Sequence, residues 1–251
     1  MEAETWKTLP KSEKTRLKRL VKLESHARAS GYRCVAGIDE VGRGPLAGPV
    51  YAAACVIPPG IFFAGINDSK LLSAPARQSL FERITAHPAV AYGIGSVDHE
   101  TIDRINIYQA SLEAMRLAMK QLIEKLGEQP DYVLIDGVNL PLPGAVSERV
   151  IQGDRLSQMI AAASILAKQT RDKVMIQYHE QYPEYGFHEH KGYSTRQHQE
   201  ALKTHGPCPI HRRSFSGVSK EPSPPLEMGD PFLSFTTEKS SHSWLGCKEA
   251  R

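Results

Sequence analysis

Two adjacent carboxylates, Asp39 and Glu40, stand at the end of an apolar run, and a loop containing Gly42 and Gly44 follows them. Neighbouring side chains of a regular strand point to opposite faces, so we expect the strand to end at this pair if both acids serve one site. Glycine lets the backbone approach a ligand closely, and Arg43 adds a guanidinium group that matches phosphate. Together they indicate metal-assisted chemistry on a phosphate group. A solvated strand end with a glycine turn is the alternative.

Two more acids follow apolar runs further along the chain: Asp136 after residues 132–135 and Asp154 after residues 149–152. If these elements are neighbours, four carboxylates converge, and their repulsion raises their pKa values unless a cation is present. Hard oxygen ligands select Mg²⁺ or Mn²⁺, and two such ions can promote hydrolysis of a phosphodiester. The alternatives are that Asp154 caps the next helix, that Asp136 begins a turn, and that Glu40 is exposed.

Short apolar runs predict the strands that must position these acids. We expect strands at residues 34–38, 50–57, 90–97, 132–135 and 149–152. Four helices are expected between and after them: one capped by Ser73 and ending before Pro88, one over residues 108–126 with Gly127 at its C-terminal end, an alanine-rich one over residues 157–179, and one that begins at Ser194 and ends at Gly206.

The chain has 251 residues, 41% of them hydrophobic, and a net charge of +3, which is too small to indicate polyanion binding by itself. The basic residues are clustered, however, and residues 1–30 predict an amphipathic basic helix. Residues 219–251 are rich in proline and serine and predict a disordered tail. No apolar stretch is long enough to span a membrane, and the four cysteines lack metal-ligand spacing, so we expect a cytoplasmic protein with reduced thiols. We also expect a monomer.

Several motifs occur in a fixed order along the chain: Gly-Ile-Asp-Glu-Val-Gly-Arg-Gly-Pro-Leu-Ala-Gly-Pro-Val from Gly37, Asp68-Ser-Lys70, Asp136-Gly137, Gly153-Asp154, Ile-Ala-Ala-Ala-Ser-Ile-Leu-Ala-Lys from Ile160, Arg171-Asp172, His190-Lys-Gly-Tyr193 and His211-Arg-Arg-Ser-Phe215. In these motifs the chain, from about Gly31 to Val218, resembles bacterial ribonuclease HII. The resemblance implies an α/β protein with the ribonuclease H-like fold: a mixed five-stranded sheet flanked by helices, followed by a C-terminal helical segment within a catalytic domain of residues 31–218.

The resemblance also implies roles for individual residues. Asp39, Glu40, Asp136 and Asp154 would be the catalytic carboxylates and would bind two Mn²⁺ or Mg²⁺ ions. The substrate-binding residues would be Gly42, Arg43 and Gly44 at the ribose 2′-OH and its phosphate, Lys70 at another phosphate, and Tyr193 at the junction between RNA and DNA. The implied substrates are RNA–DNA hybrids and duplex DNA with embedded ribonucleotides, cut on the 5′ side to leave 3′-hydroxyl and 5′-phosphate ends.

Other interpretations remain open at this point. Ribonuclease HIII shares the fold and the acids but carries a longer N-terminal domain, and a non-catalytic hybrid-binding module would be expected to lack one of the acids. Phe232 and Phe235 lie in a short apolar segment of the tail that could bind a sliding clamp. For His188 and His190 we expect solvated or phosphate-facing positions rather than a metal site.

Overall fold

The computed structural model describes residues 3–219, and these form an α/β structure around one five-stranded sheet. The strands are β1 (Val35–Val41), β2 (Val50–Val56), β3 (Ala91–Val97), β4 (Tyr132–Asp136) and β5 (Val146–Val150), in the spatial order β3-β2-β1-β4-β5. β1, β2 and β3 pair antiparallel, whereas β4 and β5 run parallel to β1. The expected mixed five-stranded sheet is confirmed.

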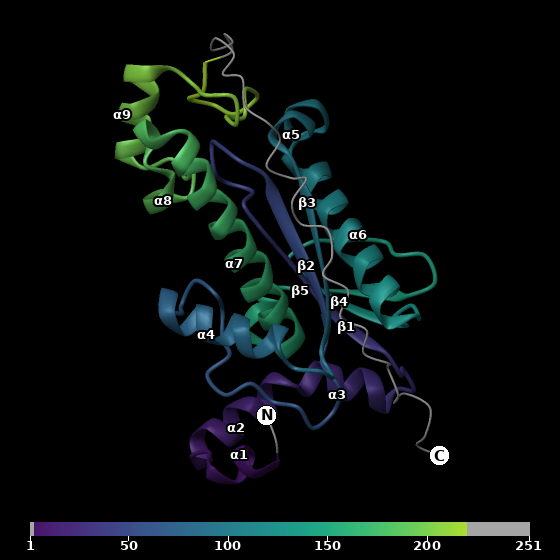
Figure 1. The fold of residues 1–251 in the computed structure, drawn as a ribbon. Coiled ribbons are helices and arrows are strands. Elements are labelled where there is room, and N and C mark those ends of the chain that lie inside the picture. Colours follow the sequence, from purple (N-terminus) through teal and green to yellow (C-terminus); the bar gives the residue numbers. More distant parts are fainter. Residues whose placement is uncertain (1–2, 220–251) are drawn as a thin grey trace.

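Two long helices cover opposite faces of this sheet, α6 (Ile107–Leu126) on one side and α7 (Gln158–Gln181) on the other (Figure 1). Ala36 and Ile38 of β1 belong to the hydrophobic cluster that contains α6, whereas Val35 and Val41 pack in the cluster that contains α7. The alternation of a strand therefore assigns the odd-numbered residues of β1 to the α7 face.

Glycines bring both helices very close to the sheet. A methyl group on Gly37 of β1 would lie 2.5 Å from the backbone nitrogen of Ile160 in α7. On the other face, methyl groups on Gly93 and Gly95 of β3 would lie 2.1 Å and 2.2 Å from carbonyl oxygens of α6. No side chain fits at these contacts, so the helix backbones rest directly on the strands.

The shorter α-helices that follow β2 are α4 (Ala74–Thr85), α5 (His99–Ile105), α8 (Phe187–His190) and α9 (Arg196–His205). Two of the expected elements differ in the structure. Ser73 caps α4 and Gly127 ends α6 in the left-handed conformation, as the sequence predicts. However, β5 begins at Val146 rather than at 149, and α9 is capped by Thr195, whose hydroxyl accepts the His198 N–H, rather than by Ser194.

The expected single basic helix at the N-terminus is instead three helices: α1 (Ala3–Thr8), α2 (Lys11–Leu20) and α3 (Lys22–Ala29). Leu17, Leu20 and Ala27 are buried in the same hydrophobic cluster as α7. A buried carboxylate makes a second connection, because Glu24 Oε1 accepts hydrogen bonds from the Ser157 hydroxyl (2.7 Å) and the Met159 N–H (3.1 Å). The N-terminal helices thus support the start of α7.

Among the described residues, no helix combines the length and the apolar composition that a membrane-spanning segment requires. Within that same part of the chain Cys34, Cys55 and Cys208 form no disulfide. The predictions for the tail, including the segment with Phe232 and Phe235, lie outside the described residues.

Candidate active site

Three of the four predicted acids meet at one point of the molecule. Asp39, Asp136 and Asp154 each place a carboxylate oxygen within 4.8 Å of the others, and all three side chains are largely or partly buried. They come from β1, the end of β4, and the short 3-10 helix η1 (Gly153–Arg155) that precedes α7.

The parallel pairing of β1 with β4 explains this meeting. Ile38 lies opposite Ile135 in the parallel register, so the next residues along the two strands, Asp39 within β1 and Asp136 at the end of β4, lie side by side. The turn after β5 then brings η1 next to them, where the Gly153 N–H donates to Asp136 Oδ1 at 2.6 Å. Asp154 follows Gly153 directly. Ser157, not Asp154, caps α7, which removes the capping alternative for Asp154.

Burial and mutual repulsion raise the pKa values of these acids. The pKa of Asp39 lies well above its usual range, first because the side chain is buried and then because Glu40 and Asp136 lie nearby. Burial also raises the pKa of Asp136, although the hydrogen bond from the Gly153 N–H opposes this rise. For Asp154, burial followed by the charges of Asp68 and Asp136 raises the pKa to about 6. The cluster therefore favours a bound proton or a bound cation.

We expected the first strand to end at Asp39 and Glu40, but β1 continues through Val41. By the alternation of a strand, Glu40 lies on the opposite face of β1 from Asp39. Its Oε1 accepts a hydrogen bond from the Arg43 guanidinium at 3.4 Å, while its buried Oε2 has no hydrogen-bond partner among the described residues. Burial raises the pKa of Glu40, and Arg43 opposes the rise. Glu40 is near the cluster but outside the group of three.

A fifth carboxylate, Asp68, which was not among the predicted site residues, completes the acidic surroundings. It is buried, hydrogen-bonded to Asp154, and paired with the Arg155 guanidinium at 3.2 Å. Its own Oδ1 accepts the N–H of Lys70, which fixes the loop that carries this lysine.

The ammonium group of Lys70 interacts electrostatically with this group of carboxylates. Partial burial lowers its pKa, but the carboxylates Asp39, Asp68, Asp154 and Asp136 outweigh that effect and raise the pKa. The side chain is exposed, so its charge is available at the edge of the acidic cluster.

The loop between β1 and β2, residues 42–49, is called the glycine loop, and it faces Tyr193. A methyl group on Gly44 would lie 3.9 Å from Tyr193 Cε1, and the Leu46 N–H donates to the Gly192 carbonyl at 2.8 Å. Tyr193 is 38% exposed, so its ring forms a surface beside the loop. Within residues 3–219, the N–H groups of Gly42, Arg43 and Gly44 donate to no acceptor.

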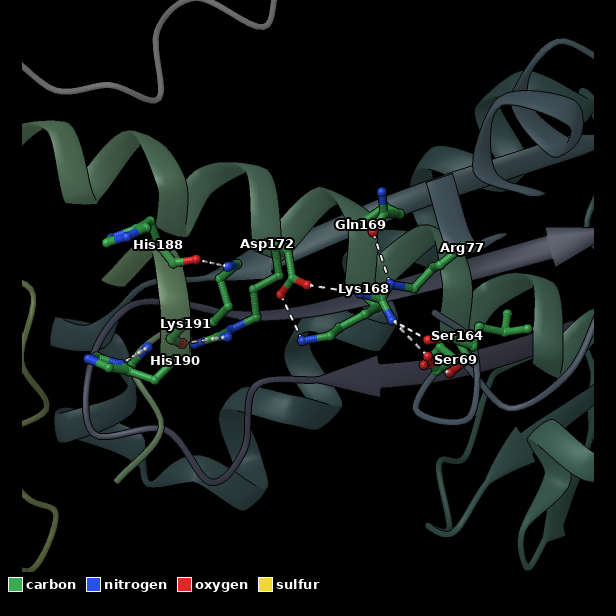
Figure 2. A network of polar contacts seen from close by, with 12 residues as sticks. Ser69, Arg77, Ser164, Lys168, Gln169, Asp172, His188, His190 and Lys191 are labelled. Carbon is green, nitrogen blue, oxygen red and sulfur yellow. Dashed lines mark hydrogen bonds and ion pairs between the residues drawn. The ribbon is translucent and has the colours of Figure 1, made fainter. Parts of the chain in front are cut away.

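Polar residues of α7 connect the acidic cluster to the loop before α4. The Ser164 hydroxyl hydrogen-bonds the Asp39 carboxylate and lies 2.9 Å from the Ser69 hydroxyl. The Arg77 guanidinium of α4 donates to the Ser69 carbonyl at 2.9 Å, as Figure 2 shows. These bonds hold the Asp68–Lys70 loop next to Asp39.

The same network continues along α7 toward Tyr193. Arg77 lies 3.6 Å from the Asp172 carboxylate, which also binds the Lys168 ammonium at 2.8 Å (Figure 2). The Lys168 ammonium in turn lies 5.8 Å from the centre of the Tyr193 ring. The Asp172 carboxylate thus connects Arg77, which holds the Asp68–Lys70 loop, with Lys168, which lies beside Tyr193.

The expectation for His190 was wrong, because it is buried rather than solvated or phosphate-facing, whereas His188 is exposed. His190 Nε2 donates to the Tyr185 carbonyl at 2.7 Å, and its ring stacks on His198. The aromatic packing of this C-terminal region, not a ligand, accounts for its position.

One hydrogen-bonded chain in this region ends at Tyr193. A carbonyl only accepts, so His198 Nδ1–H donates to the Tyr193 oxygen (3.0 Å), and its Nε2 accepts from His211 Nε2–H (3.0 Å). With its proton on Nε2, His211 Nδ1 is the acceptor for the Cys208 thiol at 3.1 Å, and the Cys208 carbonyl lies 3.2 Å from the same nitrogen.

The donor set at the acidic cluster fits a divalent cation. It consists of hard carboxylate oxygens with raised pKa values, together with the unpartnered buried oxygen of Glu40. Asp39, Asp136 and Asp154 have the positions to hold one ion jointly. No histidine or cysteine belongs to the group, which favours magnesium or manganese over zinc.

The comparisons with known proteins agree with this geometry. Residues 36–218 match the family model for ribonuclease HII. Ribonuclease HII of Bacillus pumilus is 51% identical over 199 residues, covering 79% of this chain and 76% of the relative, and that of Geobacter sulfurreducens is 52% identical over 196 residues, covering 78% and 88%.

Solved structures support the fold as well. Ribonuclease H2 of Pyrococcus horikoshii superposes with a TM-score of 0.62 at 26% identity, covering 74% of this chain and 96% of that one. The ribonuclease HII of Archaeoglobus fulgidus, solved in complex with PCNA, gives a TM-score of 0.54 at 25% identity, covering 68% and 87%. The chain belongs to the ribonuclease HII family, the endonucleases that hydrolyse the RNA strand of RNA–DNA hybrids.

Proposed function

We propose that Asp39, Glu40, Asp136 and Asp154 are the catalytic and metal-binding carboxylates, and that they hold two divalent ions, Mg²⁺ or Mn²⁺. The single observation that carries this proposal is the convergence of Asp39, Asp136 and Asp154 within 4.8 Å. Such ions, when bound, activate a water and stabilise the leaving oxygen of a phosphodiester. The carboxylates position them, and the Gly153 N–H and the Ser164 hydroxyl orient Asp136 and Asp39.

We infer that Gly42, Arg43 and Gly44 recognise the ribose. A 2′-hydroxyl both donates and accepts hydrogen bonds, and it is the feature that distinguishes RNA from DNA. The loop offers N–H groups that have no acceptor among the described residues, at a place where Gly42 is buried. Buried backbone donors almost always have partners, so the N–H of the buried Gly42 suits a ligand, and those of the half-buried Arg43 and the exposed Gly44 are open to one.

Tyr193 and Lys70 are proposed to contact the substrate on either side of the ribose. The exposed Tyr193 ring faces Gly44, so it can pack against the sugar that follows the ribonucleotide. The exposed charge of Lys70 lies next to the acids and can bind a phosphate there. Cutting is then expected on the 5′ side of a single embedded ribonucleotide, leaving 3′-hydroxyl and 5′-phosphate ends.

We further propose that residues 31–218 form the catalytic unit and that the tail serves another purpose. The family match ends at residue 218, and the A. fulgidus relative was solved in complex with PCNA. A sliding clamp could therefore bind the segment that contains Phe232 and Phe235. Deleting residues 219–251 should leave cleavage unchanged but abolish capture by immobilised clamp; loss of cleavage, or capture that persists, would contradict this assignment.

Direct binding of Mn²⁺ tests the metal assignment separately from activity. Isothermal titration calorimetry should show binding to the wild type and at least about tenfold weaker binding to Asp136→Asn, since one anionic ligand is lost. Asp98→Asn is the matched control, because Asp98 caps α5 and asparagine caps a helix equally well. Equal Mn²⁺ affinity in Asp136→Asn and the wild type would contradict the assignment.

A further inference from the structure

Two arginines that are completely inaccessible to solvent lie beneath the glycine loop. Arg171 of α7 and Arg212 each have 0% exposed surface. Arginine is almost never fully buried without a paired acid. Within residues 3–219, however, neither guanidinium lies within ion-pair distance of a carboxylate. Their hydrogen bonds go to backbone carbonyls instead.

Arg212 binds the loop that carries the proposed ribose-recognition residues. Its Nη2 donates to the Gly42 carbonyl at 2.7 Å, its Nη1 to the Arg43 carbonyl at 3.1 Å, and its Nε to the Gly48 carbonyl at 2.9 Å. One guanidinium group thus fixes both ends of the loop.

Arg171 binds the other half of the loop and joins it to the segment before Tyr193. Its Nε donates to the Pro49 carbonyl at 3.0 Å and its Nη2 to the Ala47 carbonyl at 3.2 Å. Its Nη1 donates to the Lys191 carbonyl at 3.0 Å. A methyl group on Gly42 would lie 2.4 Å from Arg171 Nε, so the loop can rest on this arginine only where it has a glycine.

The planar peptide bond turns these contacts into an orientation of the N–H groups. In a trans peptide the C=O and the following N–H point in opposite directions. The carbonyls of Gly42 and Arg43 point at Arg212, so the N–H groups of Arg43 and Gly44 point away from it. These are two of the N–H groups that have no acceptor in the described part of the chain.

Arginine stays protonated in proteins, so both groups keep their charge in spite of burial. Burial, followed by repulsion from Arg171, lowers the pKa of Arg212 to about 9, which leaves it protonated at pH 7. The Phe215 ring lies 5.0 Å from the Arg212 guanidinium and the Tyr193 ring 5.8 Å from that of Arg171. Aromatic faces and carbonyl oxygens therefore take the place of a counterion.

Burying two unpaired charges costs stability, so a role in the site is the better explanation for them than packing. We propose that Arg171 and Arg212 are positioning residues that orient the N–H groups of the glycine loop toward the ribose 2′-OH and lock the loop to the Tyr193 segment. This inference rests on the proposed ribose recognition by that loop.

The test measures selectivity for the ribonucleotide rather than activity. In an Asp136→Asn background, which is expected to bind without cutting, fluorescence anisotropy gives the affinity for a duplex with one ribonucleotide and for the same duplex made entirely of DNA. A purely structural loss lowers the folded fraction and weakens both affinities equally, so their ratio stays constant. Arg212→Gln and Arg171→Gln should instead lower this ratio by about tenfold, the order of one charge-assisted hydrogen bond.

Arg28→Gln is the matched control. The half-buried Arg28 also donates to a backbone carbonyl, that of Ile57 at 3.1 Å, but at the opposite end of β2 from the glycine loop. It should lower the unfolding temperature and leave the ratio unchanged. Arg212→Lys keeps the charge but cannot donate to the three carbonyls in the same geometry, so it should give an intermediate ratio of affinities. It replaces Arg212→Gln if that variant does not fold.

The outcomes separate the inference from the proposed function. If the Asp136→Asn parent prefers the ribonucleotide duplex and its folded arginine variants keep the same ratio of affinities, the inference alone is overturned. If the parent binds both duplexes with equal affinity, the proposed ribose recognition and the inference are overturned together.

Discussion

Asp136 Oδ1 accepts a hydrogen bond of 2.6 Å from the backbone N–H of Gly153. This bond connects the end of β4 to the residue directly before Asp154, so it fixes the distance between two acids from different elements. It is possible because Gly153 has no side chain: a methyl group there would lie 3.2 Å from the same Asp136 oxygen and 2.5 Å from Ile160 Cδ1.

Gly153→Ala should therefore reduce cleavage more than it reduces stability. The added methyl group is expected to cost about 1–3 kcal/mol of unfolding free energy through overpacking. Displacing Asp136 from Asp154 should lower kcat by at least about tenfold, since catalysis depends on fixed positions of the carboxylates. Chemical denaturation and single-turnover cleavage of an RNA–DNA hybrid measure the two effects.

A second substitution distinguishes the two contacts. Ile160→Val removes Cδ1, so Gly153→Ala combined with Ile160→Val should recover most of the stability. The contact with Asp136 remains, so the double variant should not recover its kcat. Full recovery of kcat would show that only the Ile160 contact matters.

Most of the fold was predictable because it depends on local patterns. The four strands β1 to β4, the Ser73 cap, the Gly127 end of α6 and the alanine-rich α7 all follow from apolar runs and capping residues. The three N-terminal helices were expected as one, because their packing against α7 depends on contacts more than a hundred residues apart, such as that of Glu24 with Ser157. The start of β5 was predicted too late because Ser147, Glu148 and Arg149 interrupt the apolar pattern of this strand.

The site was predictable in its acids but not in its supports. Asp136 stands at a strand end, as predicted, whereas β1 continues past Asp39 to Val41 and so directs Glu40 to the opposite face. Arg171 and Arg212 contact carbonyls more than 120 residues away, apart from the Lys191 carbonyl, so spacing carries no sign of them. Their motifs, Arg171-Asp172 and His211-Arg-Arg-Ser-Phe215, were recognised as part of the resemblance but received no role. The same holds for Asp68.

The buried Glu24 predicts a specific pH dependence. Burial raises its pKa, despite hydrogen bonds that oppose the rise, so the folded state holds this proton more tightly than the unfolded chain. Its favourable contribution is complete below the unfolded pKa of 4.5 and is lost as pH rises through the folded pKa. Glu24→Gln should therefore gain stability relative to the wild type between pH 4 and pH 7, as measured by denaturant unfolding.

Glu24→Ala is the comparison for that measurement. It removes the acceptor for the Ser157 hydroxyl and the Met159 N–H, so it should cost about 1–3 kcal/mol. If Glu24→Gln loses as much as Glu24→Ala at pH 7, then the carboxylate charge itself is required at this position.

The histidines under Tyr193 predict loss of stability in mild acid. Burial lowers the pKa of His198 to about 4 and that of His211 to about 3 from an ordinary value of 6.5, so the unfolded chain binds more protons. Their contribution is present above pH 6.5 and is lost as pH falls toward those values, at most about 1.4 kcal/mol per pH unit for each histidine. His211→Gln should flatten the decline between pH 7 and pH 5, and the exposed His26→Gln should not. An unchanged slope in His211→Gln would contradict this origin.

Tyr193 should matter for the single-ribonucleotide duplex through its ring. Tyr193→Ala is expected to lower kcat/KM on that duplex by at least about tenfold, because the loss of one stacked aromatic contact is of this order. Tyr193→Phe should retain most of the activity. Tyr108→Ala is the matched control, since Tyr108 on α6 is 43% exposed and lies outside the site. Equal kcat/KM for Tyr193→Ala and Tyr108→Ala would remove Tyr193 from the recognition of the junction.

The most direct measurement is cleavage of a DNA duplex that contains one ribonucleotide, with Mg²⁺ or Mn²⁺, by the wild type and by Asp39→Asn. The wild type should cut once, on the 5′ side of the ribonucleotide, leaving a 3′-hydroxyl and a 5′-phosphate, and should not cut the all-DNA duplex. Asp39→Asn should fold normally and lose nearly all activity, because it loses one anionic ligand with little change of shape. Near-normal cutting by folded Asp39→Asn, or equal cutting of the all-DNA duplex by the wild type, would contradict the proposed catalytic site.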